Sequence, residues 1–179
     1  MTDDALRKLI RTIPDHPKPG IQFRDITTLL ADGKGLAQAV EALAAPFEAG
    51  PGIDAVVGIE ARGFIFGTAV ACRLAVGFVP LRKPGKLPGE TIGRDFELEY
   101  GRDRIEMHRD AVRAGHRVLL VDDLIATGGT AQAAIELLNA VEAEIVECAF
   151  VIGLPDLGGM KRLTDLGCAV RTLCDFDGD

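Results

Sequence analysis

The chain has 179 residues, of which 47% are hydrophobic and 26% are charged, and its formal net charge is −7. This length suits one globular domain that buries about 70% of its unfolded surface, so we expect a single domain over residues 1–179. No stretch approaches about 20 uninterrupted apolar residues, which excludes a membrane-spanning helix. The acidic balance argues against a general nucleic-acid binder, whereas anionic substrates stay compatible because local placement of Arg and Lys decides their binding.

Residues 1–30 contain a short helical stretch, then a proline-rich segment, then Ile21-Gln-Phe-Arg-Asp-Ile. This part is too small for an independent domain. We expect it to form a small hood over one edge of the larger fold. The acidic first residues are not followed by an apolar signal core, which disfavours secretion.

From residue 36 onward, helix-compatible and strand-like segments alternate. The helix-compatible segments are Leu36–Glu48, Phe64–Leu74, Ala131–Ala140 and Leu157–Asp165. The strand-like runs are Ala55–Ile59, Val76–Leu81, Arg117–Val121, Ile145–Ile152 and Val170–Leu173. Such alternation predicts an α/β fold with a mainly parallel, twisted central sheet flanked by helices. In folds of this kind, ligands bind beyond the carboxyl ends of the strands.

Residues 83–103 interrupt the alternation, because they are polar, charged and rich in Gly and Pro, with little apolar periodicity. We predict a long flexible loop. A loop of this length inside a compact domain often serves as a lid over a site.

The chain contains four cysteines in apolar surroundings and without CxxC spacing: Cys72, Cys148, Cys168 and Cys174. We interpret them as reduced core thiols rather than disulfides or zinc ligands, which predicts a cytoplasmic protein. Three histidines share no metal-ligand spacing: His16, His108 and His116. We interpret these as surface or structural residues.

Residues 118–130 read Val-Leu-Leu-Val-Asp-Asp-Leu-Ile-Ala-Thr-Gly-Gly-Thr, and a helix is expected from about Gln132. The N–H groups of such a turn before a helix suit a phosphate, and adjacent carboxylates can bind sugar hydroxyls or help hold a divalent cation. A structural turn is the alternative, but Asp122 and Asp123 would repel each other unless a ligand or cation compensates. Because the Walker pattern is absent, the segment predicts a sugar phosphate rather than a nucleoside triphosphate.

This segment resembles the phosphoribosyl-pyrophosphate signature of the type I phosphoribosyltransferases. Further motifs are similar to those of the adenine-specific branch of that family and follow its order: Pro19-Gly-Ile-Gln-Phe-Arg-Asp-Ile-Thr, Gly58-Ile-Glu-Ala-Arg-Gly-Phe, Arg82-Lys-Pro-Gly-Lys-Leu-Pro and Leu98-Glu-Tyr-Gly. The resemblance covers nearly the whole chain. It implies the type I phosphoribosyltransferase fold and conversion of adenine and phosphoribosyl pyrophosphate into AMP and pyrophosphate.

The resemblance also implies how the donor is bound. Asp122 and Asp123 would hold the ribose hydroxyls of phosphoribosyl pyrophosphate. The 5-phosphate would lie in the turn formed by Ala126, Thr127, Gly128, Gly129 and Thr130. This agrees with the physical expectation that N–H and hydroxyl donors converge where the helix dipole is positive.

The pyrophosphate would lie against the turn Glu60, Ala61 and Arg62, which in the family often has a non-proline cis peptide, here expected between Glu60 and Ala61. Arg62 would donate charge-assisted hydrogen bonds to pyrophosphate and act in catalysis; the alternative is an Arg that merely starts a helix. A basic cluster after the strand that ends at Leu81 would also bind pyrophosphate: Arg82, Lys83 and Lys86. A solvated basic turn is the alternative, and some of these residues could serve a neighbouring subunit.

By the same resemblance, Glu99 is the residue that handles a proton of the purine, and Tyr100 helps to close the lid. The chemistry needs such a group, because bonding through one ring nitrogen requires a proton to be managed elsewhere on the base. Adenine would be recognised by Gln22, Phe23 and Arg24, with Phe23 stacking on the base. The alternative is that Phe23 belongs to the core of the hood and that Arg24 pairs locally with Asp25.

The implied cofactor is Mg²⁺, held mainly by the substrate and water and by no direct protein ligand. The implied assembly is a homodimer, and we expect neither a nucleic acid nor a membrane as a partner. Two other functions stay open at this point. One is a phosphoribosyltransferase for another purine or for xanthine, and the other is a regulatory protein that binds phosphoribosyl pyrophosphate without catalysis.

Overall fold

The computed structural model describes residues 3–49, 52–98 and 101–178. Its helices are α1 (Asp3–Arg7), α2 (Thr27–Ala31), α3 (Gly33–Glu48), α4 (Gly63–Leu74), α5 (Gly129–Ala140) and α6 (Gly159–Asp165), with a 3₁₀ helix, η1, at Pro155–Leu157. Its strands are β1 (Arg11–Pro14), β2 (Gln22–Asp25), β3 (Ala55–Ile59), β4 (Gly77–Leu81), β5 (Thr91–Leu98), β6 (Gly101–His108), β7 (Arg117–Ile125), β8 (Glu144–Gly153) and β9 (Val170–Asp175).

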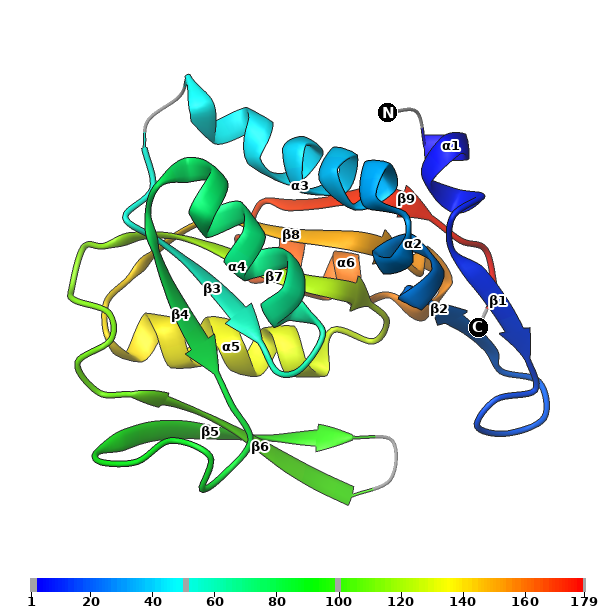
Figure 1. Ribbon diagram of the computed structural model, residues 1–179. Coiled ribbons are helices and arrows are strands. Elements are labelled where there is room, and N and C mark those ends of the chain that lie inside the picture. Colours follow the sequence, from blue (N-terminus) through cyan, green and yellow to red (C-terminus); the bar gives the residue numbers. More distant parts are fainter. Residues whose placement is uncertain (1–2, 50–51, 99–100, 179) are drawn as a thin grey trace.

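Five strands form one parallel sheet in the order β4-β3-β7-β8-β9 (Figure 1). The prediction of an α/β fold with a mainly parallel central sheet is therefore confirmed. The five expected strands are all present, and three of them, β7, β8 and β9, are longer than expected. β7 continues beyond Val121 to Ile125 and pairs with β8 along the way, so Asp122 and Asp123 lie within the strand rather than after it.

Two apolar cores, one on each face of the sheet, hold the helices in place. Successive strand residues point to opposite faces, so Val56 and Leu119 lie in the core beneath α3 and α4, together with Phe66. Val57 and Leu120 lie in the other core, which contains the apolar side of α5. Burial on both faces explains why the central strands are continuous apolar runs.

The helices differ from expectation at two places that shape the site. α5 begins at Gly129 rather than at about Gln132. The segment expected as one helix over Leu157–Asp165 is divided at Gly158, whose φ of 74° is left-handed and separates η1 from α6. Glycine adopts this conformation without the steric cost that a side chain adds.

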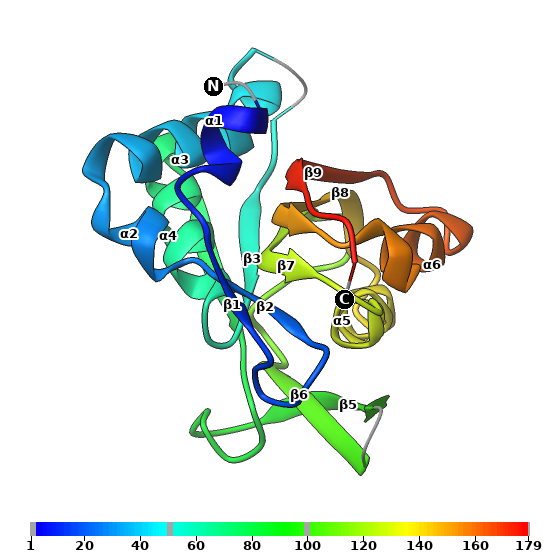
Figure 2. The ribbon, with the colours of Figure 1, turned by 90° about the vertical axis from the view of Figure 1, so that its right-hand side faces the viewer.

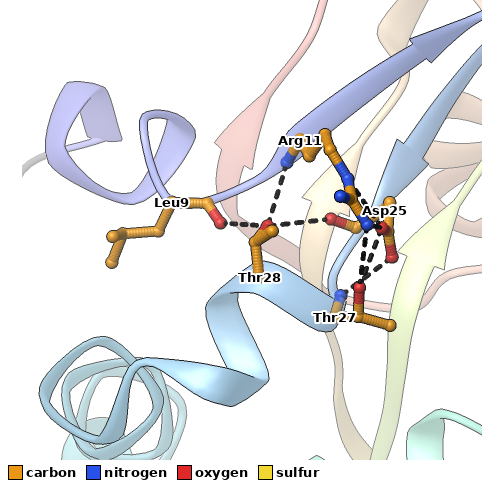
Figure 3. Close-up of polar contacts among 5 residues, drawn as sticks. All are labelled: Leu9, Arg11, Asp25, Thr27 and Thr28. Atoms are coloured by element: carbon orange, nitrogen blue, oxygen red, sulfur yellow. Dashed lines mark hydrogen bonds and ion pairs between the residues drawn. The ribbon is translucent and has the colours of Figure 1, made fainter.

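The N-terminal segment forms α1, a two-stranded antiparallel ribbon of β1 and β2, and α2. The ribbon lies on the side toward which the arrowheads of β7 and β8 point (Figures 1 and 2). Asp25 fastens its two strands to α2, because Oδ2 accepts from Arg11 Nε at 3.1 Å and Oδ1 accepts from the Thr27 N–H at 2.9 Å (Figure 3). Thr28 Oγ1 donates to the Leu9 carbonyl at 2.7 Å and so joins α2 to the chain before β1.

The prediction of a long loop over residues 83–103 is wrong for its second half. β5 and β6 form an antiparallel hairpin in which Thr91 pairs with His108, and it lies below the central sheet in Figure 1. Phe96, Ile105 and Met107 bury their side chains in the core shared with α5, which anchors the hairpin. The lid function of this region stays a prediction.

The described cysteines are all free. Cys148 and Cys174 are buried and Cys168 is half-buried, but Cys72 is exposed, so its interpretation as a core thiol is wrong. Burial raises the pKa of the Cys174 thiol to about 12. A thiol with so high a pKa is a poor nucleophile at neutral pH.

Candidate functional site

A polar cavity of about 270 Å³ lies where β3 and β7 end and α5 begins. Its lining residues come from three segments: Ile59, Glu60, Ala61, Arg62, Lys83, Asp122, Asp123, Leu124, Ile125, Ala126, Thr127, Gly128, Gly129, Thr130 and Ala131. Most of the residues predicted to bind the donor therefore line one cavity. Its position at the carboxyl end of the sheet is the one that α/β folds use for ligands.

Both carboxylates line this cavity; Asp122 is half-buried and Asp123 is buried. Asp123 is only 4% exposed, and its backbone N–H donates to Asp122 Oδ1 at 2.9 Å. Desolvation, and then the charge of Asp123, raise the pKa of the Asp122 carboxyl; desolvation also raises the pKa of Asp123, against the opposing effect of Arg62. Two such groups favour a bound proton, a cation or hydroxyl donors near them.

Arg62 lies over this pair. Its Nε is 2.7 Å from Asp123 Oδ2, but among the described residues that buried oxygen has no partner with hydrogen-bond geometry. Asp123 Oδ2 is therefore enclosed, and the Arg62 guanidinium is its close charged neighbour. Arg62 precedes α4, but its side chain lines the cavity and pairs with Asp123, which speaks against a role limited to starting the helix.

The turn after the acid pair is shaped by close backbone approach. Gly128 has φ 77°, and a Cβ there would lie 3.0 Å from the Cα of Gly159. The Gly159 N–H donates to the Ala126 carbonyl at 3.0 Å, so α6 braces the turn. Because α5 begins at Gly129, the N–H groups of Gly129 and Thr130 belong to its first turn, where backbone donors lack helical partners and suit an anion.

The peptide bond between Glu60 and Ala61 is cis, as expected. The Glu60 carboxylate accepts from Arg82 Nε and Nη2, both at 3.2 Å, and from the Lys83 N–H at 2.9 Å. The Arg82 hydrogen bond is the main cause that lowers the pKa of Glu60. The Arg82 guanidinium thus binds Glu60, and Arg82 does not line the cavity.

The basic cluster is divided by the structure. Lys83 lines the cavity, whereas Arg82 and Lys86 do not. Lys86 contributes through its carbonyl, which accepts from Arg82 Nη1 at 3.2 Å.

A second, largely apolar cavity of about 440 Å³ adjoins the first and shares Arg62, Leu124, Ala126 and Thr127 with it. Its other lining residues come from β2 with the residue before it, and from the segment after β8: Ile21, Gln22, Phe23, Arg24, Leu154 and Leu157. All three residues predicted to bind the base therefore line one cavity. Phe23 contacts His16 edge-on, with ring centroids 5.1 Å apart.

Arg24 is held on the side of the C-terminal segment. It donates to Thr12 Oγ1 at 2.6 Å and to the Asp177 carbonyl at 3.0 Å, and its guanidinium carbon lies 4.5 Å from the Phe176 ring centroid. A local pair of Arg24 with Asp25, the alternative considered from the sequence, is contradicted because Asp25 binds Arg11 and Thr27.

Sequence reasoning missed the apolar residues of the second cavity: Ile21, Leu124, Leu154 and Leu157. A signal for two of them was present, because Leu154 and Leu157 follow the carboxyl end of β8 and so belong to the ligand edge of the sheet.

Glu99 and Tyr100 lie outside the described residues. The described part of the chain holds no group of three or more His, Cys, Asp or Glu side chains that could bind a metal ion, and none of its helices is long and apolar enough to span a membrane.

Comparisons with known proteins agree with this arrangement. The model of the phosphoribosyl transferase domain matches residues 27–176. The adenine phosphoribosyltransferase of Methylobacillus flagellatus is 60% identical over 172 residues, which cover 96% of this chain and 97% of that protein.

Two crystal structures share the fold. The adenine phosphoribosyltransferase of Thermoanaerobacter pseudethanolicus is 46% identical with a TM-score of 0.91, covering 98% of this chain and 100% of that one. The Saccharomyces cerevisiae enzyme, complexed with D-2,5-dideoxy-2,5-imino-altritol 1,6-bisphosphate and adenine, is 40% identical with a TM-score of 0.88, covering 96% and 97%. The chain therefore belongs to the phosphoribosyl transferase family and, within it, to the adenine phosphoribosyltransferases.

Proposed function

We propose that the chain transfers the 5-phosphoribosyl group of phosphoribosyl pyrophosphate to adenine, with the donor in the polar cavity and the base in the apolar cavity. The observation that carries this assignment is that the two cavities share Arg62, Leu124, Ala126 and Thr127. A ligand in one cavity therefore lies next to a ligand in the other, as bond formation between a base and a ribose requires.

On the donor side, Asp122 and Asp123 accept hydrogen bonds from the ribose hydroxyls. Both residues line the polar cavity, which supports this role. The turn Ala126–Thr130 binds the 5-phosphate through backbone N–H groups at the start of α5 and through the hydroxyls of Thr127 and Thr130. Fixing both ends of the ribose phosphate leaves the anomeric carbon oriented for attack.

Arg62 and Lys83 stabilise the leaving pyrophosphate, on which negative charge grows while positive charge grows on the ribose. Both side chains line the polar cavity. Arg82 acts indirectly, because its two hydrogen bonds hold Glu60 and thereby the cis turn before Arg62. Lys86 supports Arg82 through its carbonyl.

On the acceptor side, Phe23 stacks on adenine, and Gln22 and Arg24 line the same cavity. Donors and acceptors placed for adenine would oppose an oxopurine, and mismatches of this kind reduce binding strongly. Glu99 handles the proton of the purine, Tyr100 helps to close the site, and the hairpin of β5 and β6 excludes water from the activated sugar.

Mg²⁺ suits this site as a partner of the donor rather than of a protein cage. Asp122 and Asp123 offer a desolvated pair of carboxylates, but no third ligating side chain joins them among the described residues. When bound, Mg²⁺ would take its ligands mainly from pyrophosphate oxygens and water and would neutralise the charge of the leaving group. We place the enzyme in the cytoplasm as a homodimer; light scattering after gel filtration tests the assembly.

Incubation with labelled adenine, phosphoribosyl pyrophosphate and Mg²⁺ tests the proposal, and AMP is the expected product. Turnover of guanine or xanthine in place of adenine would contradict the base assignment. Binding of phosphoribosyl pyrophosphate without turnover of any base would indicate a regulatory protein instead.

A further inference from the structure

Lys83 belongs to two groups at once. It lines the polar cavity, and its ammonium group forms an ion pair with Asp103 of β6. In the hairpin, Asp103 pairs in register with Phe96, and Lys83 Nζ lies 5.8 Å from the Phe96 ring centroid. Lys83 therefore belongs to the cavity lining, while its amine contacts the hairpin.

Asp103 is arranged as a dedicated partner for this amine. Its Oδ2 accepts from Lys83, while its Oδ1 accepts from the Arg104 N–H at 2.8 Å. The Lys83 hydrogen bond is the main cause that lowers the pKa of the Asp103 carboxyl. The Asp103 carboxylate thus stays charged beside Lys83, the cation proposed to bind the pyrophosphate group of the donor.

Two neighbouring cations, Arg62 and Arg82, have partners of a different kind. Arg62 pairs with Asp123, and Arg82 pairs with Glu60; both carboxylates line the cavity themselves. Asp103 lies on the hairpin and is not a cavity-lining residue. Its contact with Lys83 therefore links the hairpin to the pyrophosphate end of the site.

We propose that Asp103 is a placeholder for pyrophosphate: its carboxylate holds Lys83 while the pyrophosphate position is empty and releases Lys83 to the oxygens of the incoming ligand. This rests on the proposed function, because it takes pyrophosphate as the ligand of Lys83. A multiply charged pyrophosphate attracts an ammonium more strongly than one carboxylate does. The exchange of partners is therefore downhill, although the existing pair must first be broken.

The cost of that exchange is modest. Lys83 is 42% exposed and Asp103 is 23% exposed, and ion pairs with solvent access contribute about 0.2–1 kcal/mol, which corresponds to a factor of about 1.4 to 5 in affinity. The hairpin base does not depend on the pair, because Arg82 and Glu106 exchange backbone hydrogen bonds of 2.8 and 2.7 Å. Release of Lys83 thus frees Asp103 without detaching the hairpin.

Calorimetric titration of pyrophosphate in the presence of Mg²⁺ tests the placeholder in the variant Asp103→Asn. We expect pyrophosphate to bind about 1.4- to 5-fold more tightly than to the wild type. The KM for phosphoribosyl pyrophosphate should fall by a similar factor, whereas the KM for adenine should stay unchanged. Equal or weaker binding of pyrophosphate would overturn the proposal.

Removal of any negative charge near an anion site strengthens binding somewhat, so two further variants isolate the role of Lys83. Asp95 lies on the same hairpin, but its carboxylate pairs with Arg104 rather than with Lys83. The variant Asp95→Asn should therefore leave pyrophosphate affinity unchanged. In a Lys83→Met background, Asp103→Asn should add no gain. The proposal is wrong if the gain persists there or if Asp95→Asn matches it.

Should Asp103→Asn fold poorly, Asp103→Ser takes its place with the same expectations. AMP formation by the wild type tests the enzyme's function separately. A wild type that makes AMP, together with an Asp103 variant that gains no pyrophosphate affinity, contradicts the placeholder alone.

Discussion

Among single residues, Gly63 determines the space in which Asp122 can lie. A Cβ at Gly63 would lie 2.7 Å from Asp122 Oδ1 and 2.9 Å from the Val121 carbonyl oxygen. Gly63→Ala should therefore displace the carboxylate and cost about 1–3 kcal/mol of folding free energy, as overpacking does. We also expect a raised KM for phosphoribosyl pyrophosphate, measured from initial rates, with stability taken from urea unfolding.

Gly33→Ala is the matched control. Gly33 is also the first residue of a helix, but a Cβ there meets no atom within 4 Å. That variant should leave both quantities nearly unchanged. Equal effects in the two variants would show that the Gly63 contact with Asp122 is unimportant.

Glu99 lies outside the described residues, so only its proposed proton role can be tested. Glu99→Gln keeps the size and hydrogen-bonding capacity of the side chain but removes its titration. Turnover should fall by about two orders of magnitude or more, in keeping with general acid–base catalysis, while affinity for phosphoribosyl pyrophosphate changes little. Glu97→Gln serves as the control, and a loss of turnover in that variant alone would reassign the role to Glu97.

The ribbon of β1 and β2 is an element whose position depends on one carboxylate. Arg11, and then the N–H and hydroxyl of Thr27, hold the pKa of Asp25 at about 2, below the usual value of about 3.9. A lowered folded-state pKa means that Asp25 contributes stability above about pH 4 and loses it as the pH falls toward 2. The stability difference between wild type and Asp25→Asn should therefore be constant at neutral pH and shrink between about pH 4 and 2.

Thermal unfolding at a series of pH values measures this difference. Asp110→Asn, a change to an exposed carboxylate in the turn after β6, should give no such pH-dependent difference. Because β2 carries Gln22, Phe23 and Arg24, Asp25→Asn should also raise the KM for adenine more than that for phosphoribosyl pyrophosphate. A stability difference that does not change with pH would contradict the role of the Asp25 charge.

The elements that the sequence predicted correctly are those whose residues are apolar on both faces, such as β3 and β8. Their burial leaves a continuous signal. The hairpin of β5 and β6 gave no such signal, because its buried residues Phe96 and Met107 alternate with charged residues and glycine. Its stability depends on packing against α5, which lies far along the chain, and on cross-strand pairs such as Arg104 with Asp95.

The residues of the site also divide into those that the sequence predicts and those that depend on tertiary contacts. Residues in compact motifs, such as Asp122 and Thr127, were predictable because a phosphate needs donors close together along the chain. Leu154 and Leu157 were missed because they resemble core residues in pattern, and only their position after β8 marked them as belonging to the ligand edge. The partners Asp103 and Glu60 were also unpredictable as partners, because each ion pair is fixed by the tertiary position of Lys83 or Arg82.

The whole molecule carries a net charge of −7, yet its proposed substrate, phosphoribosyl pyrophosphate, carries several negative charges, so overall charge cannot attract it. Three cations on the donor side are each matched by a carboxylate: Arg62 by Asp123, Arg82 by Glu60 and Lys83 by Asp103. Asp122 adds a further carboxyl group to the cavity lining. These pairs leave little net positive charge on the donor side, so anion binding depends on helix N–H groups and on rearranged ion pairs rather than on a general attractive field.

The two adjoining cavities join the N-terminal ribbon to the central sheet, so a ligand that fills both should stabilise the molecule more than either of its halves. AMP combines the base with the ribose 5-phosphate. At about 100 times its Kd, it should stabilise the fold by about 2.7 kcal/mol, which for a chain of this size corresponds to a rise in Tm of about 5–10 °C. Ribose 5-phosphate and adenine at the same concentration fill one cavity each and should give smaller shifts, separately and together, because neither connects the ribbon to the phosphate turn. A Tm with AMP no higher than that with ribose 5-phosphate would mean that the apolar cavity is not the base site.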